Sequence, residues 1–510
     1  MTAVRLKQSA LVARMLLSFF RRRVLRAGVL ESMPVRVFVM VAAVLLLGVM
    51  CTAAYFFLQP LANEAAVWRL LFDTSTVSLL LWVQIAFLLV KVLFINAERM
   101  LQFSYQLPVT NRERSMAFLM YEAAMTGIIA TAGLISLAVS ALILLGPSAA
   151  SYIVASVILP VALTYLVLSV LYQLMTRLWI LLKIGRMAGI LNVLFLFVVL
   201  AYYSTLMTPM IQDISGAYLD NKTEYMWVTM VSWAWNEYSP WLTLAGVTLL
   251  SAVLTAAVFV LAPNQHLHQS RYLNLPGSVR LRGVLGPYDW CLLRSSQTVA
   301  TSAMAVAVFY YLLLVQSSMN PMWGLSALSF GGLYQFTATQ PLRTLPGARA
   351  SAWAVYYRLI RAQLVLLSVF AVPAITITMA IYPTRLLSTG AALAACLGGS
   401  VMTTCISIVF PAEKDNPFSV FVGLSVVIIV LGLSMIGLGL LRLPLWAVTA
   451  CLVGAAIAFV WYAVQGIRTS ESRIRNAQGT VGREGRHRVR VAHTDHGSGD
   501  TALSHVFNRT

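Results

Sequence analysis

Residues 37–58 read VFVMVAAVLLLGVMCTAAYFFL and contain no charged side chain. A helix of about 20 such residues crosses the hydrocarbon core of a bilayer. Apolar side chains cover every face of this predicted helix, whereas a transmembrane β-strand alternates apolar and polar residues over about ten positions. The segment therefore predicts a membrane-spanning helix and excludes a β-barrel.

Comparable apolar runs recur along the whole chain. Those long enough to span a membrane begin near Val37, Leu70, Ala117, Tyr152, Met187 and Trp241 in the first half and near Val299, Met322, Ala362, Leu387, Phe418 and Pro444 in the second. The composition agrees, because 59% of the 510 residues are hydrophobic and 10% are charged, which excludes a set of soluble domains. The predicted fold class is an all-α, polytopic integral membrane protein with about 12 transmembrane helices in two six-helix halves. The run from Tyr152 to Lys183 is longer than one span needs, which leaves the count open by one or two.

Lysine and arginine are distributed unevenly between the two sides of the predicted bundle. Most of those in the connections lie on the side that also holds both termini, whereas the opposite side carries Arg69, Lys222, Arg385 and Arg442. Because cytoplasmic loops are enriched in these residues, both termini are expected in the cytoplasm, and the absence of a signal peptide suits a bacterial inner membrane. The net charge of +19 is explained by the excess of Lys and Arg in the cytoplasmic connections, where these residues can contact anionic lipid head groups. No folded basic domain that could bind nucleic acid is predicted.

Five regions are predicted along the chain. Residues 1–35 form an amphipathic cytoplasmic interfacial helix, whose apolar face carries Val12, Leu16, Phe19, Phe20 and Val24. Residues 36–262 form the first six-span half and residues 297–467 the second. A cytoplasmic linker with its own interfacial helix, residues 263–296, joins the halves. The basic, glycine-containing segment 468–510 is predicted to be a disordered cytoplasmic tail.

A similar order of residues follows the second predicted span of each half. In the first half the order is Gln102-Phe103-Ser104, Leu107-Pro108, Ser115 and Tyr121, and in the second it is Gln335-Phe336-Thr337, Leu345-Pro346, Ser351 and Tyr357. The spacings differ, but both copies lie in the first cytoplasmic connection of a six-span half. This position predicts a parallel repeat, with the two halves related by an axis along the membrane normal.

Each copy contains a proline that breaks a helix, which predicts two short turns: the first elbow (residues 107–114) and the second elbow (residues 345–349). In the first elbow, Thr110 and Glu113 have the spacing of a capping box that begins a new helix. The pattern from Leu107 to Glu113, between the second and third spans and after an amphipathic N-terminal helix, resembles the permease subunits of type-2 exporters of the ATP-binding cassette (ABC) class. In that family six spans form a half-transporter, and the elbow docks on a separate ATPase as a coupling helix.

The resemblance implies that the two elbows hold the residues that couple the chain to an ATPase: Leu107, Pro108, Arg112, Glu113, Arg114, Leu345, Pro346 and Arg349. The prolines are expected to set the shape of each elbow, and the charged residues are expected to contact two copies of a cytoplasmic ABC ATPase subunit. This chain departs from the family pattern because it fuses two halves. Its second elbow, with Gly347 and Ala348, also has no acidic residue that matches Glu113.

The chain carries no glycine-rich phosphate-binding loop followed by Lys and Ser or Thr, so no ATP is expected to bind it in that manner. It is therefore not predicted to be an enzyme, and ATP and Mg are expected on the partner ATPase alone. All six histidines lie outside the predicted spans, and no catalytic, cofactor or metal site is predicted. The expected function is export of an apolar or amphipathic cargo, driven by ATP that separate cytoplasmic subunits hydrolyse.

Two alternative functions are an ion-coupled secondary transporter and a noncatalytic membrane scaffold. An ion-coupled carrier needs ionisable residues at depth, and it would make Glu122 or Asp73 essential. Lys91 and Glu122 lie near predicted cytoplasmic ends of spans and Asp73 near an outer end, so the distribution of charge favours an external ATPase. The outer connection from Gln212 to Pro240 is a candidate cap over the exit, or a site for an amphipathic or cationic cargo.

Overall fold

The structure is a computed structural model that describes the chain except for residues 1–5, 26–31, 62–63, 95–108, 184, 221–225, 263–284, 317, 344, 346–349, 412–428, 430–431, 433–443 and 495–510. The described residues form α-helices joined by short 3-10 and π segments, and they contain no strand.

The first half consists of long helices and short connecting pieces: α1 (Leu6–Leu25), α2 (Met33–Leu58), η2 (Gln59–Leu61), α3 (Ala65–Phe94), α5 (Asn111–Leu145), η3 (Gly146–Ser148), α6 (Ala149–Ile153), the π segment η4 (Val154–Ile158), α7 (Leu159–Leu181), η5 (Gly185–Met187), α8 (Ala188–Leu219), α9 (Met230–Glu237) and α10 (Pro240–Leu261). The second half consists of α11 (Pro287–Leu293), α12 (Ser296–Leu314), the 3-10 helix η6 (Pro321–Gly331), α13 (Gly332–Ala338), α14 (Gln340–Arg343), α15 (Ala352–Ile381), η7 (Pro383–Arg385), α16 (Leu386–Val409) and α18 (Leu445–Thr494).

Within the described residues, nine helices are long and apolar enough to cross a membrane. This agrees with the predicted fold class, an all-helical multi-pass membrane protein. Many large apolar side chains on these helices face outward, as on α2, where Phe38, Val44 and Phe57 are exposed. Such side chains are expected where lipid rather than water surrounds a helix. The predicted number of twelve spans stays a prediction.

One of the nine candidates, Arg112–Leu181, contains two of the predicted spans. It is interrupted at Gly146, whose φ of +63° is a backbone conformation that glycine adopts without a steric penalty. Beyond this residue the chain runs back along α5, because Ala141 packs near Tyr152 and Leu119 packs near Tyr165. The reversal separates the spans predicted near Ala117 and Tyr152.

The span predicted near Met322 is formed by η6 and α13 in place of one long α-helix. A 3-10 helix rises about 2.0 Å per residue and an α-helix about 1.5 Å, so the two segments together extend roughly 30 Å, the thickness of the hydrocarbon core. Gly324 allows this segment to lie directly on α12, because a Cβ atom there would be 2.5 Å from the backbone nitrogen of Phe309. The span predicted near Phe418 lies outside the described residues.

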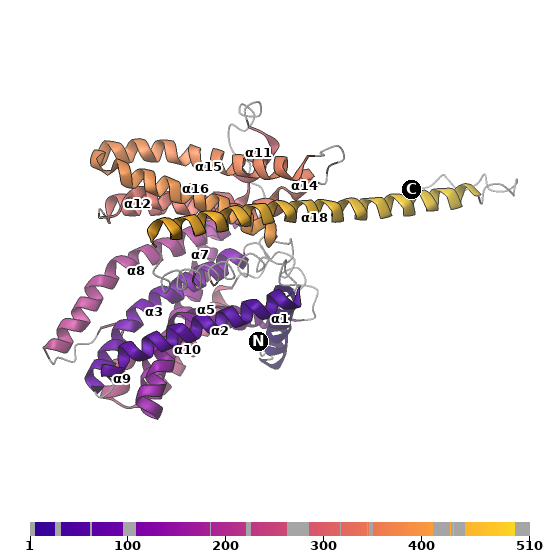
Figure 1. Ribbon diagram of the computed structural model, residues 1–510. Helices are drawn as coiled ribbons and strands as arrows, with labels where there is room; N and C mark the ends of the chain where they lie inside the picture. Colours follow the sequence, from indigo (N-terminus) through magenta and orange to yellow (C-terminus); the bar gives the residue numbers. More distant parts are fainter. Residues whose placement is uncertain are drawn as a thin grey trace, which may run out of the picture.

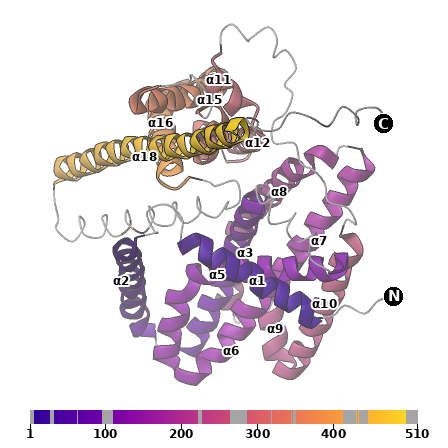
Figure 2. The same ribbon diagram turned by 90° about the vertical axis from the view of Figure 1, so that its right-hand side faces the viewer.

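The elements of the first half lie together, apart from those of the second half, in both views of the molecule (Figures 1 and 2). The halves meet where α8 packs on α12. At this contact the hydroxyl oxygens of Ser204 and Tyr311 are 3.1 Å apart. Val35 and Val39 of α2 also pack against the apolar core of the second half. The two halves are therefore joined by direct helix contacts within the described residues.

Helix α18 begins with the last predicted span and continues to Thr494. Residues 468–494 are thus helical in the structure, where the sequence predicts a disordered tail. The polar part of the helix contains Arg, Ala and Gln, which have high intrinsic helix propensity, but also Gly479, Gly482 and Gly485, whose propensity is low.

Candidate functional site

The first elbow contains a helix cap, because Thr110 is the N-cap of α5 and residues 111–114 form the first turn of that helix. The Thr110 hydroxyl accepts a hydrogen bond from the backbone nitrogen of Glu113 at 3.3 Å, and Oε2 of Glu113 accepts one from the backbone nitrogen of Thr110 at 2.9 Å. This reciprocal pair is the capping box predicted from the sequence, and it satisfies two backbone donors at the start of α5. The Glu113 side chain is thereby engaged within the protein, and the residue is only 4% exposed.

The charged residues beside this cap differ in exposure. Arg112 is exposed, whereas Arg114 is 7% exposed and has interactions within the protein. Leu107 and Pro108 lie outside the described residues. Of the predicted coupling residues that the structure describes in this elbow, Arg112 is therefore the one that a partner can reach without rearrangement. The coupling role itself stays a prediction.

Helix α1 packs against the beginning of α5. Val12, Ala13 and Leu16 of α1 are buried in one cluster with Ala117 and Tyr121 of α5. Val12 and Leu16 belong to the apolar face predicted from the sequence, and Arg14, Arg21 and Arg22 are exposed. The apolar face of the amphipathic helix is thus partly covered by protein, which fixes α1 next to the first elbow.

The second half repeats this arrangement. Helix α15 begins at Ser351, whose hydroxyl accepts a hydrogen bond from the backbone nitrogen of Ala354 at 3.2 Å. Helix α11 packs on α15, with Tyr288 and Leu292 buried beside Leu359. In each half, a short or amphipathic helix therefore packs on the helix that begins after the elbow.

Within the second elbow, Leu345 is 56% exposed, and Pro346 and Arg349 lie outside the described residues. Nearby, α11 is fixed to α15 by an ion pair between Asp289 and Arg361, with Oδ2 and Nη2 2.7 Å apart. The same oxygen accepts a hydrogen bond from the backbone nitrogen of Gly286 at 2.8 Å. Asp289 is 2% exposed, so the pair buries a carboxylate between the two helices. Neither Asp289 nor Arg361 is among the site residues predicted from the sequence.

A second buried ion pair joins Lys91 of α3 to Glu122 of α5, with Nζ and Oε2 2.5 Å apart. The Lys91 ammonium group also lies 4.3 Å from the centre of the Tyr172 ring and 5.3 Å from that of Phe87. Ring faces attract a cation, and the carboxylate neutralises it, so the charge is compensated where water is scarce. The pair holds α3 against α5 at the elbow end of the bundle, the end that carries α1 and α11 in Figure 1.

Between α13 and α15 the second half contains a contact of two buried amides. Gln335 Nε2 donates to the backbone oxygen of Leu359 at 2.7 Å, and Gln363 Nε2 donates to Gln335 Oε1 at 3.2 Å. Gln335 is 0% exposed and Gln363 is 1% exposed. Sequence reasoning did not select either residue as a site. The sequence signal that could have found them is a glutamine within an otherwise apolar run. Burying its amide group in a membrane costs free energy unless the amide is hydrogen-bonded.

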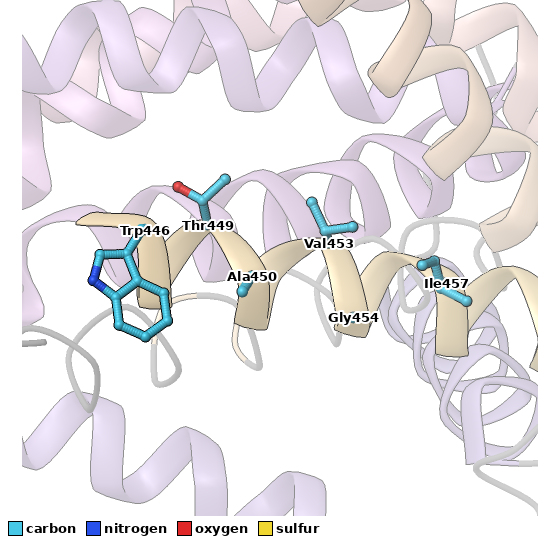
Figure 3. A pocket seen from close by; sticks show the side chains of 6 residues that line it. All are labelled: Trp446, Thr449, Ala450, Val453, Gly454 and Ile457. Atoms are coloured by element: carbon cyan, nitrogen blue, oxygen red, sulfur yellow. The ribbon is translucent and has the colours of Figure 1, made fainter. Parts of the chain in front are cut away.

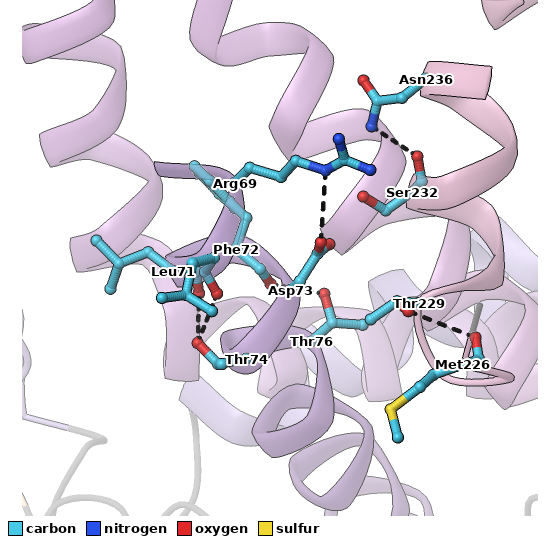
Figure 4. Close-up of polar contacts among 11 residues, drawn as sticks. Arg69, Leu71, Phe72, Asp73, Thr74, Thr76, Met226, Thr229, Ser232 and Asn236 are labelled. Carbon is cyan, nitrogen blue, oxygen red and sulfur yellow. Dashed lines mark hydrogen bonds and ion pairs between the residues drawn. The ribbon is translucent and has the colours of Figure 1, made fainter. Parts of the chain in front are cut away.

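Asp73 of α3 lies near the opposite end, where α3 meets α9 (Figure 4). Its Oδ2 is 3.9 Å from Nε of Arg69, and the Ser232 side chain of α9 lies near the carboxylate. Oδ1 is buried and has no hydrogen-bond partner among the described residues. One turn further along α3, the Thr76 hydroxyl donates to the backbone oxygen of Ser156 in the π segment η4 at 2.7 Å. Polar groups from three elements therefore meet at this end.

A groove of about 680 Å³ lies along α18 (Figure 3). Its described lining comes from one face of that helix: Trp446, Thr449, Ala450, Val453, Gly454 and Ile457. The lining is mostly apolar and offers one hydroxyl group, so it contains no set of convergent polar groups that would orient a ligand.

The described residues contain no group of three or more His, Cys, Asp or Glu side chains that could hold a metal ion. Their most regular feature is the repeated arrangement at the elbow end: a capped helix after each elbow, a helix packed on it and a buried polar contact to the preceding helix. Comparison of the chain with protein-family models, with curated proteins and with solved structures finds no match.

Proposed function

We propose that the chain is the membrane permease of an ABC-type exporter, with twelve spans in two six-span halves. Separate cytoplasmic ATPase subunits would bind ATP and Mg and hydrolyse the nucleotide. The cargo is apolar or amphipathic, and the protein resides in a bacterial inner membrane with both termini in the cytoplasm. These features follow from the resemblance in the first elbow and from the asymmetric distribution of Arg and Lys.

The observation that carries the proposal is the repetition at the elbow end. Helix α1 packs on α5 and α11 packs on α15. Each of α5 and α15 begins at a side-chain cap, which lies within the first elbow in one half and just after the second elbow in the other. Both α1 and α11 lie at the same end of the molecule in Figure 1. This arrangement supports the proposal, because a pair of ATPase subunits that close on ATP requires two equivalent contact points on one face.

In this mechanism, closure of the two ATPase subunits displaces the elbows, and the attached spans change their packing. Arg112 is the exposed charge beside the first elbow, and Leu345 is the exposed apolar residue of the second. Arg112 suits a carboxylate on a partner, whereas Leu345 suits an apolar pocket. The resulting change in the spans opens the cargo path on alternate sides of the membrane.

Affinity purification of the tagged chain from its own membranes, followed by mass spectrometry, tests the partner. A cassette ATPase is expected in the wild-type sample. The double variant R112E/L345D should lose this ATPase, and R468E should retain it, because Arg468 is an exposed arginine that lies outside both elbows. Retention of the ATPase by R112E/L345D would contradict docking at the elbows.

An ion-coupled carrier is the second candidate, and the polar cluster around Asp73 is the observation that favours it. The carboxylate lies within a candidate span and has one buried oxygen without a hydrogen-bond partner among the described residues. Reconstitution of the chain alone into vesicles separates the two functions. Uphill transport driven by a proton or sodium gradient, and lost in D73N, would support the carrier and exclude the ATP-driven exporter.

A further inference from the structure

The two helix caps give a common reference for comparing the halves. Twelve residues after Thr110, the cap of α5, lies Glu122, and twelve residues after Ser351, the cap of α15, lies Gln363. Glu122 pairs with Lys91 of α3, and Gln363 bonds to Gln335 of α13, so each side chain contacts a helix that comes before the elbow of its own half. The structure therefore places Glu122 and Gln363 at equivalent positions of the two halves. The similar order of residues in the sequence does not pair them: there Tyr121 corresponds to Tyr357, yet Tyr121 is 0% exposed and Tyr357 is 68% exposed.

In the first half the contact is the ion pair of Lys91 and Glu122, which joins α3 to α5. Only 7% of the Lys91 side chain and 13% of the Glu122 side chain are exposed. Because water is largely excluded, the attraction between the charges is only weakly screened. Separating the two side chains would leave either charge without compensation in a medium of low polarity, which is strongly unfavourable.

In the second half the contact is the pair of amides of Gln335 and Gln363, which joins α13 to α15. Gln335 also bonds to the backbone of α15 at Leu359, so two hydrogen bonds cross between the helices. Gly332 leaves the space that this contact occupies, since a Cβ atom there would lie 3.2 Å from Nε2 of Gln363. A hydrogen bond in this setting is costly to break, because both amides would remain buried without partners.

In sequence, the first elbow lies between Lys91 of α3 and Glu122 of α5, and α14 and the second elbow lie between Gln335 of α13 and Gln363 of α15. Each polar contact thus joins a helix that comes before an elbow to the helix that follows it. Without such a contact, a force applied to the elbow would spread the two helices apart. With the contact in place, the two helices move together, and the displacement reaches the rest of the bundle.

We propose that Lys91–Glu122 and Gln335–Gln363 are equivalent struts, each of which locks the two helices around an elbow into one lever. These are positioning residues, and they act through the helices rather than by touching the ATPase or the cargo. The strut of the first half is charged and that of the second half is neutral, so the two levers use different chemistry for the same task. This inference rests on the proposed function only for its transport consequence, because the locking itself is a property of the chain alone.

Hydrogen–deuterium exchange of the purified full chain tests the locking without any partner. In E122A, exchange should increase in peptides from both helices, at the end of α3 and at the beginning of α5. E122Q should lie between the wild type and E122A, because its amide oxygen still accepts a hydrogen bond from Lys91 but no longer neutralises the buried ammonium charge. In Q363A, the same two-sided increase is expected in α13 and α15.

Two buried residues provide matched controls on the same helices. Thr126 of α5 and Thr378 of α15 are 1% and 0% exposed, and their hydroxyl groups have no hydrogen-bond partner among the described residues. T126A and T378A should leave exchange across the elbows unchanged. If E122A and Q363A raise exchange only in the mutated helix, or no more than the controls do, the struts do not exist.

Transport measurements with the ATPase present test the lever. Cargo moved per ATP hydrolysed should fall about tenfold in E122A and Q363A, which is a typical size for coupling between distant sites. E122Q should recover part of this ratio, because the hydrogen bond to Lys91 remains while the charge compensation is lost. A general loss of folding would lower hydrolysis and transport together and leave their ratio unchanged, and that result would overturn the lever. Failure to find an ATPase would overturn the proposed function alone, since the exchange result does not depend on it.

Discussion

Neighbouring residues at the first elbow have different surroundings. Arg112 is exposed, Glu113 completes the capping box and Arg114 is buried. Successive residues of an α-helix are rotated by about 100°, so three in a row cover most of its circumference. The resemblance implies that all three residues contact an ATPase, but only Arg112 is exposed. Glu113 and Arg114 contribute to the protein's own structure.

The role of Glu113 in the cap leads to a first prediction. E113A removes the acceptor for the backbone nitrogen of Thr110 and should destabilise the protein by about 1 kcal/mol, the usual cost of losing a helix cap. E113Q keeps an oxygen acceptor and should stay close to the wild type, because glutamine also forms capping boxes. Thermal unfolding of the purified protein in detergent measures both variants. Equal losses in the two variants would show that the charge, rather than the cap, is what matters.

Packing between elements depends on glycine at one close approach in the second half. At Gly324 the nearest atoms to an added Cβ would be backbone atoms of α12, at 2.5 Å from the nitrogen and 2.8 Å from the Cα of Phe309. Backbone in the middle of a helix cannot move aside as a flexible side chain can. The approach of η6 to α12 therefore depends on the absence of a side chain at this position.

G324A should push η6 away from α12 and destabilise the second half by about 1–3 kcal/mol, the range seen when extra atoms are forced into a packed core. G398A serves as the control, since a Cβ at Gly398 of α16 meets no atom within 4 Å and alanine favours the helix. The melting temperature of each variant in detergent gives the comparison. A G324A protein as stable as G398A would indicate that η6 and α12 are not in such close contact.

The packing of α1 on α5 provides another prediction at the level of elements. Leu16 is 3% exposed in this contact, whereas Leu11 on the same helix is 69% exposed. L16A should cost about 2–5 kcal/mol, typical of a buried leucine, and L11A should cost little. Hydrogen exchange within α1 reports the loosening of the helix, and it should rise in L16A alone. Similar exchange in both variants would mean that α1 is held by the membrane surface and not by α5.

At the scale of the whole molecule, the two ends of the bundle have different character. The elbow end carries α1, α11 and both caps, whereas the opposite end carries α9 and the polar cluster around Asp73 (Figures 1 and 4). The halves are joined by α8 and α12, which run between these ends. If the elbow end faces the cytoplasm, as the distribution of basic residues predicts, the α9 end faces outward.

Cysteine labelling tests this orientation. Lys183, between α7 and α8, and Leu219, at the far end of α8, are both exposed and lie on opposite sides in the proposed topology. In a background in which the five native cysteines are replaced by serine, L219C should react with a membrane-impermeant maleimide in intact cells. K183C should react only after the membrane is permeabilised. The reverse pattern would place the elbows outside the cell and exclude cytoplasmic ATPase subunits.

The class of fold, the positions of most long helices and the cap at Thr110 could be predicted from the sequence, because they depend on local composition. A long apolar run must be helical in lipid, and a capping box involves residues three positions apart. The sequence also identified Val12 and Leu16 as one apolar face. The packing of the helices sets which partner covers that face, makes η6 a 3-10 helix fitted against α12, and puts Glu122 and Gln363, at equivalent distances from their helix caps, against a preceding helix. These features arise from contacts between residues far apart in the chain. The geometry of such contacts depends on how the helices pack, and the short-range pattern of a sequence does not encode that packing.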